Sequence, residues 1–235
     1  MNIALLIPIT SQGRQWKNLY YSYFINLTLA TFLLTKNDCY NYTFYLGFDE
    51  DDSLFNNSNT IELLEKIFDE LNLKLNITIY KNVTKGHLTL LWNILYQKAY
   101  DDNNDYFYQC GDDIDFKTKD WVKDSVEILI KNNNFGVSGP NNIKISTNIL
   151  TQAMVSRKHM ELFGYLYPPS IINWYCDNWL SEVYSPNHYF QLNQHYAPNL
   201  GGPERYNIET DKTSYLYELI IGQKKVNNYI AKNFN

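Results

Sequence analysis

The N-terminal half of this 235-residue chain alternates between strand-like and helix-like hydrophobic patterns. Short apolar runs predict strands, and apolar residues that recur every three or four positions predict helices. The predicted strands are 3–9, 42–48, 74–80 and 106–110, and the helices between them are 16–34, 60–71 and 86–100, with Thr60 as a candidate N-cap. Such alternation is typical of right-handed βαβ units. We therefore expect an α/β fold with a mainly parallel central sheet flanked by helices.

Beyond residue 116 the pattern is less regular. The sequence predicts helices at 120–131, 157–163 and 178–184 and strands at 135–138 and 151–156, and the remainder is rich in aromatic residues, proline and glycine. We find no linker and no internal repeat in the chain. We expect a single domain over 1–235, made of an N-terminal half (1–116) and an irregular C-terminal half (117–235).

Composition excludes several classes of protein. The net charge is −5, and no basic run is present, which argues against a nucleic-acid partner. The three cysteines are widely spaced, as expected of a reduced, intracellular protein. The N-terminus lacks the features of a signal peptide. The apolar stretch 19–34 is short for a membrane span and contains polar residues such as Ser22 and Thr28, so we expect a core helix and a cytoplasmic protein without a membrane span.

A cluster of carboxylates follows the strand at 106–110. The apolar strand residues give way to Gly111, and Asp112, Asp113 and Asp115 lie within the next four positions. A buried strand that ends in charge places that charge at an edge of the sheet, and open α/β sheets bind ligands beyond the carboxyl edge. Carboxylates this close repel one another unless a cation neutralises them, and oxygen ligands suit Mg²⁺ or Mn²⁺. The alternative interpretation is a solvated acidic turn.

Two further polar turns should reach the same edge. One follows the first strand and runs from Pro8 through Thr10 to Arg14, and the other begins at Asp49 after the second strand. Neither turn carries the glycine-rich pattern of a dinucleotide-binding site or a P-loop. An acidic edge without such a loop instead suggests phosphates that bind through a metal ion.

The C-terminal half contains two further clusters of functional residue types. Asp177 lies among aromatic residues, where burial would raise the pKa of its carboxyl group toward that of a general base; the alternative is a packing cluster in which Asp177 caps the helix at 178–184. Downstream, Gly201 and Gly202 permit a close backbone approach to phosphate, and Arg205 offers two donors. His195 is a candidate metal ligand, although a lone histidine is more often structural.

Taken together, these segments resemble the GT-A glycosyltransferases, which transfer a sugar from a nucleotide donor to an acceptor. The resemblance rests on segments spread over most of the chain: 3–8, the acidic turn at 49–52, the helix at 86–100 with Trp92 and Asn93, Gly111 to Asp115, Asp177 to Trp179, and 195–205. The stretch from Val155 to Gly164 also resembles a protist and giant-virus branch of this fold, so the chain is expected to be viral or protist, and in the host cytoplasm if viral.

The resemblance implies a role for each matching residue. Asp113 corresponds to the metal-binding carboxylate, helped by Asp112 or Asp115, and His195 to the late histidine ligand. Asp177 corresponds to the acidic residue that precedes a tryptophan and serves as the base in inverting members. The residues expected to contact the nucleotide sugar are Pro8, Thr10, Arg14, Asp49, Asp112 and Arg205.

The implied activity is metal-dependent transfer of a sugar from a nucleoside-diphosphate donor, UDP-linked, to a hydroxyl acceptor, with Mn²⁺ or Mg²⁺ as cofactor and a C-terminal half that binds the acceptor. Inversion and retention of the sugar's configuration both remain open. Two alternatives are a sugar-phosphate nucleotidyltransferase and a non-catalytic glycan-binding protein of the same fold. The first turn lacks the glycine-rich, basic character of the former.

Overall fold

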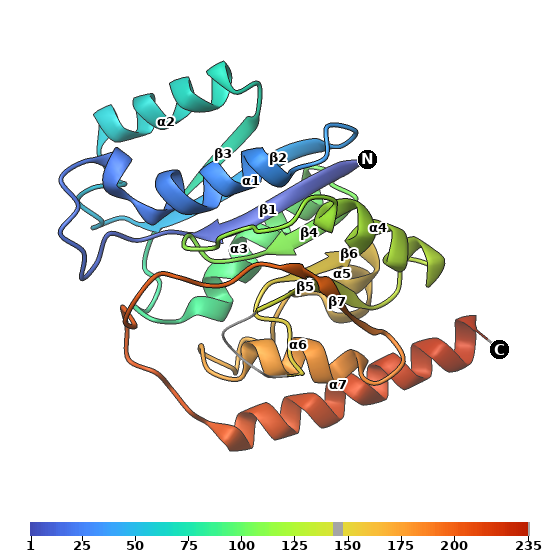
Figure 1. Cartoon of the computed structure of the whole chain (residues 1–235). Coiled ribbons are helices and arrows are strands. Elements are labelled where there is room, and N and C mark those ends of the chain that lie inside the picture. Colours follow the sequence, from blue (N-terminus) through green and yellow to red (C-terminus); the bar gives the residue numbers. More distant parts are fainter. Residues whose placement is uncertain (143–147, 235) are drawn as a thin grey trace.

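The computed structural model describes residues 1–142 and 148–234 (Figure 1). Its centre is a seven-stranded sheet with the order β3-β2-β1-β4-β6-β5-β7. The strands are β1 (Asn2–Pro8), β2 (Asn41–Asp49), β3 (Lys74–Tyr80), β4 (Tyr106–Gln109), β5 (Val137–Asn141), β6 (Ala153–Ser156) and β7 (Tyr189–Tyr196). Strands β1 to β4 are parallel, and β6 runs antiparallel to its neighbours β4 and β5. The expected mainly parallel α/β sheet is therefore confirmed.

Helices cover both faces of the sheet (Figure 1). They are η1 (Leu19–Tyr21, a 3-10 helix), η2 (Phe24–Leu29, a π-helix), α1 (Ala30–Thr35), α2 (Ser58–Glu70), α3 (Leu88–Asp101), α4 (Trp121–Lys131), α5 (Arg157–Phe163), α6 (Cys176–Tyr184) and α7 (Lys212–Asn233). No helix within the described residues is long and apolar enough to cross a membrane.

Alternation along the central strand creates two hydrophobic cores. Ala4 and Leu6 of β1 face the core that contains side chains of α3, α5, α6 and α7. Ile3, Leu5 and Ile7 face the other core, which contains side chains of η2, α1, α2 and α4. All five residues are fully buried. A strand covered on both faces reads as a continuous apolar run, and this is why β1 is so clear in the sequence.

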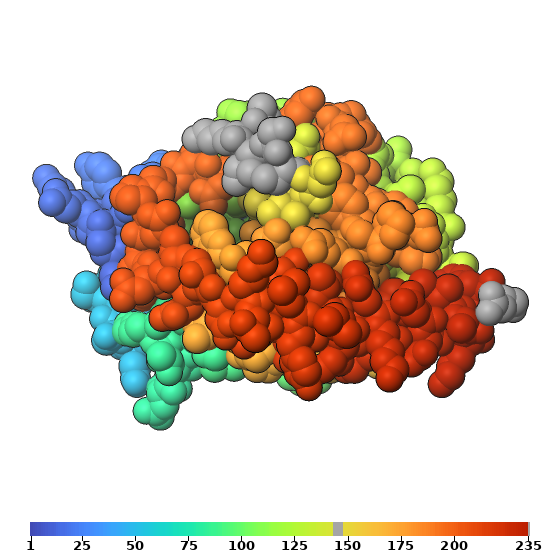
Figure 2. Space-filling view, turned by 90° about the horizontal axis from the view of Figure 1, so that it is seen from below, coloured from blue at the N-terminus to red at the C-terminus, as the bar shows by residue number. Residues whose placement is uncertain are grey.

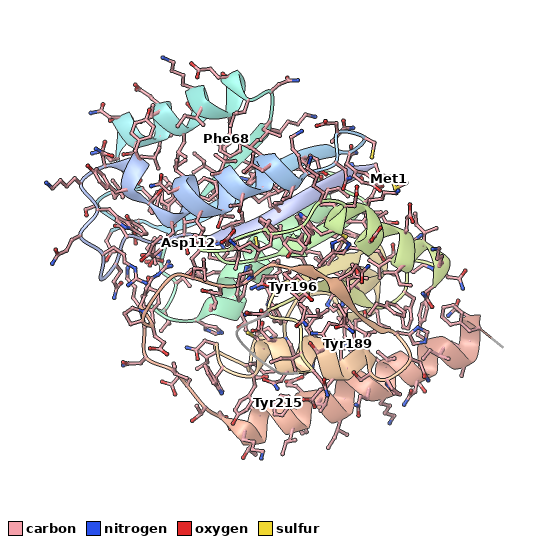
Figure 3. The ribbon with its side chains drawn as sticks, viewed as in Figure 1. Met1, Phe68, Asp112, Tyr189, Tyr196 and Tyr215 are labelled. Carbon is pink, nitrogen blue, oxygen red and sulfur yellow. The ribbon has the colours of Figure 1, made fainter. Side chains whose placement is uncertain are left out.

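The parallel arrangement brings the turns after β1, β2 and β4 to one edge of the sheet. Figure 3 shows Asp112 at this carboxyl edge, whereas Met1 lies at the opposite, amino end of β1. After β7, residues 197–211 run along the same edge before α7 begins (Figure 1). We call residues 197–211 the strap.

Two local predictions are wrong. Residues 16–34 do not form one helix but the succession η1, η2 and α1. Ser22 ends η1, because its hydroxyl group donates to the carbonyl of Leu19 and accepts from the amide of Ile25. The N-cap of α2 is Asn57, whose side chain accepts from the amide of Asn59, and not Thr60.

The C-terminal half is more regular than its composition indicates. Irregular backbone is found at 164–175 and in the strap, whereas β7 and α7 are regular elements that the sequence pattern does not predict. Figure 2 shows α7 lying across one face of the molecule. Tyr215, Leu219, Gly222 and Val226 form its buried side.

Candidate functional site at the carboxyl edge of the sheet

The acidic turn after β4 is held in place by two threonines, one from η2 and one from α1. Thr28 of η2 is fully buried, and its hydroxyl group accepts from the amide of Ile114 at 2.9 Å. The hydroxyl group of Thr31 accepts from the amide of Phe116 at 3.0 Å. Thr28 of the π-helix η2 and Thr31 of the following helix α1 therefore present their hydroxyl groups to the backbone of the acidic turn. π-Helical turns are frequent at functional sites.

Asp112 and Arg205 form a buried, bidentate ion pair. The two guanidinium nitrogens of Arg205 donate to the two carboxylate oxygens of Asp112 at 2.9 and 2.7 Å. Nη2 of Arg205 also lies 3.5 Å from Oδ2 of Asp113. One cation therefore contacts both carboxylates, which shows that their oxygens face a common point.

Asp113 is enclosed by backbone. A Cβ atom on Gly201 would lie 1.6 Å from its Oδ2, and one on Gly111 would lie 2.7 Å from its Oδ1. The carbonyl of Asp113 also accepts from the amide of Leu200 at 3.0 Å, which ties the turn to the strap. Burial, together with the neighbouring charge of Asp112, raises the pKa of Asp113 to about 6, and Arg205 opposes this rise.

The turns after β1 and β2 are joined by Asp52. Its carboxylate accepts from the hydroxyl group of Thr10 at 3.0 Å and from the amide and hydroxyl group of Ser11, both at 2.7 Å. It also accepts from the amides of Leu54 and Phe55. A buried carboxylate with five donors fixes both turns in one arrangement.

Asp49, at the end of β2, contacts both a lysine and the strap. It accepts from Nζ of Lys85 at 2.9 Å and from the hydroxyl group of Tyr206 at 3.1 Å. The hydroxyl group of Tyr206 also lies 3.4 Å from Oγ1 of Thr10. Adjacent strap residues, Arg205 and Tyr206, thus cover Asp112 and Asp49.

The side chain of Arg14 holds the strap by hydrogen bonds to backbone carbonyls of the strap. Its Nη2 donates to the carbonyls of Gly201 at 2.6 Å and Pro203 at 3.1 Å. Pro8, the last residue of β1, lies next to Gly47 of β2 and leads into this turn. Of the predicted nucleotide contacts, the structure brings Thr10, Arg14, Asp49, Asp112 and Arg205 together around the strap.

A pocket of about 490 Å³ lies beside the strap, within the ~300–1,000 Å³ typical of small-molecule sites. Its lining includes Gln12, Lys85, Asn173, Arg205, Tyr206 and Glu209. Another pocket of about 510 Å³ lies at the amino ends of β1 to β3. Because ligands of open α/β sheets bind beyond the carboxyl ends of the strands, we assign the candidate site to the pocket at the strap.

Asp115 and His195 are each engaged elsewhere. Asp115 forms an ion pair with Lys117. The ring of His195 contacts Oγ1 of Thr118 at 3.0 Å through Nδ1 and Oδ2 of Asp124 at 2.8 Å through Nε2. Across residues 1–142 and 148–234, no three His, Cys, Asp or Glu side chains gather in a way that could hold a metal ion.

The pair Asp112 and Asp113 nevertheless fits a divalent cation. Mg²⁺ commonly binds through one or two carboxylates together with substrate phosphates, without a cage made only of protein ligands. The guanidinium of Arg205 contacts oxygens of both carboxylates, so the pair can share a single cation.

Asp177 lies in the first turn of α6, and its side chain does not cap that helix, whose N-cap is Tyr175 without a side-chain cap. The proposed capping role is therefore wrong. Burial raises the pKa of Asp177 to about 7, although Sγ of Cys176, 3.6 Å from Oδ1, opposes the rise. Asn173, four residues earlier, links this segment to the strap, because its side chain donates to the carbonyl of Asn207 and accepts from the amide of Glu209.

Sequence reasoning missed three residues of the site. In the sequence, Asp52 cannot be distinguished from its neighbour Asp51, because both are aspartates of the same acidic turn. The structure distinguishes them, since Asp52 is buried and Asp51 is exposed. Tyr206 directly follows the predicted Arg205, so its position in the cluster was a usable signal. For Lys85 we find no signal in the sequence.

The sheet order, the acidic turn after β4 and the strap define a GT-A-like fold. No family model matches the chain, and no curated protein sequence matches it significantly. Solved structures do match.

S. aureus TarS, a glycosyltransferase, has this fold. Its complex with UDP, in a form covering residues 1–349, superimposes with a TM-score of 0.58 at 11% identity over 95% of this chain and 64% of that one. A longer TarS chain gives a TM-score of 0.57 at 13% identity over 94% of this chain and 38% of that one. This chain thus spans less than two thirds of the length of each. At these identities the likeness establishes the fold.

Proposed function

We propose that the protein transfers a sugar from a UDP-linked donor to a hydroxyl acceptor. The observation that carries this proposal is the convergence of three turns and the strap around the pair Asp112–Asp113 and its bridging Arg205. The UDP complex of a structural neighbour with the same fold supports the choice of nucleotide.

In this proposal the N-terminal half, 1–116, binds the donor. Thr10, Arg14 and Asp49 contact the nucleotide at the ends of β1 and β2, and Arg205 contacts the diphosphate. Asp112 and Asp113 hold Mn²⁺ or Mg²⁺, which when bound neutralises charge on the departing diphosphate. Asp115 and His195, the other ligands that the sequence predicts, are engaged by Lys117 and by Thr118 and Asp124.

The C-terminal half, 117–235, binds the acceptor. Asp177 deprotonates the acceptor hydroxyl group if the sugar's configuration is inverted, since a carboxyl group with a pKa of about 7 can accept a proton at neutral pH. If configuration is retained, Asp177 orients the acceptor or donor.

The test is release of UDP from a panel of UDP-sugars in the presence of Mn²⁺, followed with and without candidate acceptors. We expect release of UDP from at least one donor. Release of pyrophosphate from UTP and a sugar phosphate, without UDP release, would instead identify a nucleotidyltransferase. Binding of glycans without release of either product would identify a binding protein.

A further inference from the structure

The positive charge that contacts the carboxylates of Asp112 and Asp113 comes from a side chain of the same protein, Arg205. The side chains of Arg205 and Asp112 are only 13% and 3% exposed, and the guanidinium also contacts Asp113. A buried, bidentate arginine–carboxylate pair is a strong and directional interaction. Arg205 therefore already supplies positive charge to the carboxylate pair Asp112 and Asp113.

We propose that Arg205 is a built-in counter-cation that keeps a divalent metal away from Asp112 and Asp113 until a nucleoside diphosphate binds. Metal and nucleotide then bind cooperatively, and neither carboxylate is exposed to free metal alone. This inference rests on the proposed function and specifies how its donor site is assembled.

The charges at the site support this order of events. The two carboxylates are matched by two arginines: Arg205, which contacts both of them, and Arg14, whose charge also acts on Asp113. A metal ion that arrived alone would have to displace Arg205 and would leave an excess of positive charge. A diphosphate brings negative charge of its own, which both the metal and the displaced guanidinium offset.

The position of Arg205 on the strap supplies a way to release it. Arg205 and Tyr206 are adjacent, and they cover Asp112 and Asp49, two of the predicted donor contacts. Both contacts are between side chains, whereas Arg14 and Asn173 hold the strap by its backbone carbonyls. A nucleotide can therefore displace the two side chains while the ends of the strap remain attached.

The experiment measures Mn²⁺ binding by titration calorimetry, with and without saturating UDP, for the wild type, Arg205→Gln, Arg205→Lys and Ile208→Ala. For the wild type, we expect UDP to raise the affinity for Mn²⁺ by about tenfold or more, and Mn²⁺ to raise the affinity for UDP by the same factor. Arg205→Gln should bind Mn²⁺ alone at least about tenfold more tightly than the wild type, with a smaller effect of UDP. Circular dichroism checks that each variant is folded.

The other two variants separate charge from strap structure. Arg205→Lys keeps the positive charge and should retain weak binding of Mn²⁺ alone. Ile208→Ala changes an exposed strap residue outside the pocket lining and should leave that affinity at the wild-type value. If Mn²⁺ alone binds the wild type and Arg205→Gln equally, or if UDP does not change Mn²⁺ affinity in the wild type, the inference is wrong. The proposed function then still stands as long as UDP binds, and it fails if UDP does not bind at all.

Discussion

At the scale of single residues, Asp52 fixes the shape of the carboxyl edge of the sheet. It is 7% exposed and accepts five hydrogen bonds from the turns after β1 and β2. Replacing it leaves those donors without partners in a buried place, and hydrogen bonds to charged groups contribute more than neutral ones.

We therefore expect Asp52→Ala to lower the free energy of unfolding by about 2–3 kcal/mol and to weaken UDP binding. The matched control is Asp51→Ala, because the Asp51 side chain is 67% exposed and forms an ion pair with Lys85, whose side chain is 46% exposed. Its effect on stability should be below about 1 kcal/mol. Chemical denaturation of the two variants measures the difference, and equal losses would contradict the role given to Asp52.

Asp177 gives a prediction on pH. Burial raises its pKa to about 7, so below that pH the carboxyl group is mostly protonated and cannot accept a proton. If Asp177 is the base, kcat/KM should rise tenfold per pH unit below about pH 7 and level off above it.

Replacing Asp177 with Asn should abolish transfer and leave UDP binding unchanged. A rate that is independent of pH between 5 and 7, or an active Asp177→Asn variant, would remove Asp177 from the base role.

Several site residues could be predicted from the sequence, but their partners could not. The cluster Asp112, Asp113 and Asp115 is visible as a motif, yet the three carboxylates face Arg205, the backbone at Gly201 and Lys117, respectively. Asp112 and Arg205 are 93 residues apart in the sequence, and only the folded strap brings them together. Which acid binds a cation therefore depends on contacts that residue type does not encode.

At the scale of secondary-structure elements, the buried strands were the easiest to predict. Strands covered on both faces are continuous apolar runs, and β1, predicted at 3–9, spans Asn2–Pro8. The half-exposed edge strand β3 was also predicted, with its observed bounds, Lys74–Tyr80. The segment 16–34 was misassigned, because the bonds of Ser22 end η1 and a π-helix follows. The apolar residues keep a helical spacing across the break at Ser22 and through the π-helix, so hydrophobic periodicity alone cannot predict either one.

Helix α7 was not predicted from the sequence, for a different reason. Leu216, Tyr217 and Ile220 are 44%, 64% and 69% exposed, so apolar residues lie on its outer side as well as its buried side. The amphipathic contrast that predicts a helix is therefore weak. At Gly222 the two helices approach closely, since a Cβ atom there would lie 2.6 Å from Cγ2 of Val183 in α6.

This close approach predicts that Gly222→Leu destabilises the packing of α7 on α6. The added side chain overlaps Val183 and Trp179, and overpacking of this kind costs about 1–3 kcal/mol. Lys224→Leu introduces the same residue at an exposed position of α7 and should change stability by no more than about 0.5 kcal/mol. Thermal or chemical denaturation compares the two, and equal stability would show that α7 does not depend on this contact.

At the scale of the whole molecule, the sheet order converts a linear series of polar turns into one site. Strands β2, β1 and β4 are adjacent and parallel, so the turns that follow them meet at one edge, and the strap after β7 crosses that edge. The structures of S. aureus TarS share this fold at 11–13% identity. The two proteins thus share the arrangement of helices and strands, although few of their aligned residues are identical.

Titration of UDP into the wild-type protein in the presence of Mn²⁺ tests the central claim most directly. The account predicts saturable binding at one site per chain, weakened by Asp52→Ala and lost when both Asp112 and Asp113 are replaced with Asn. Failure of UDP to bind, or binding that survives loss of both carboxylates unchanged, would contradict the placement of a nucleotide-sugar site at this edge.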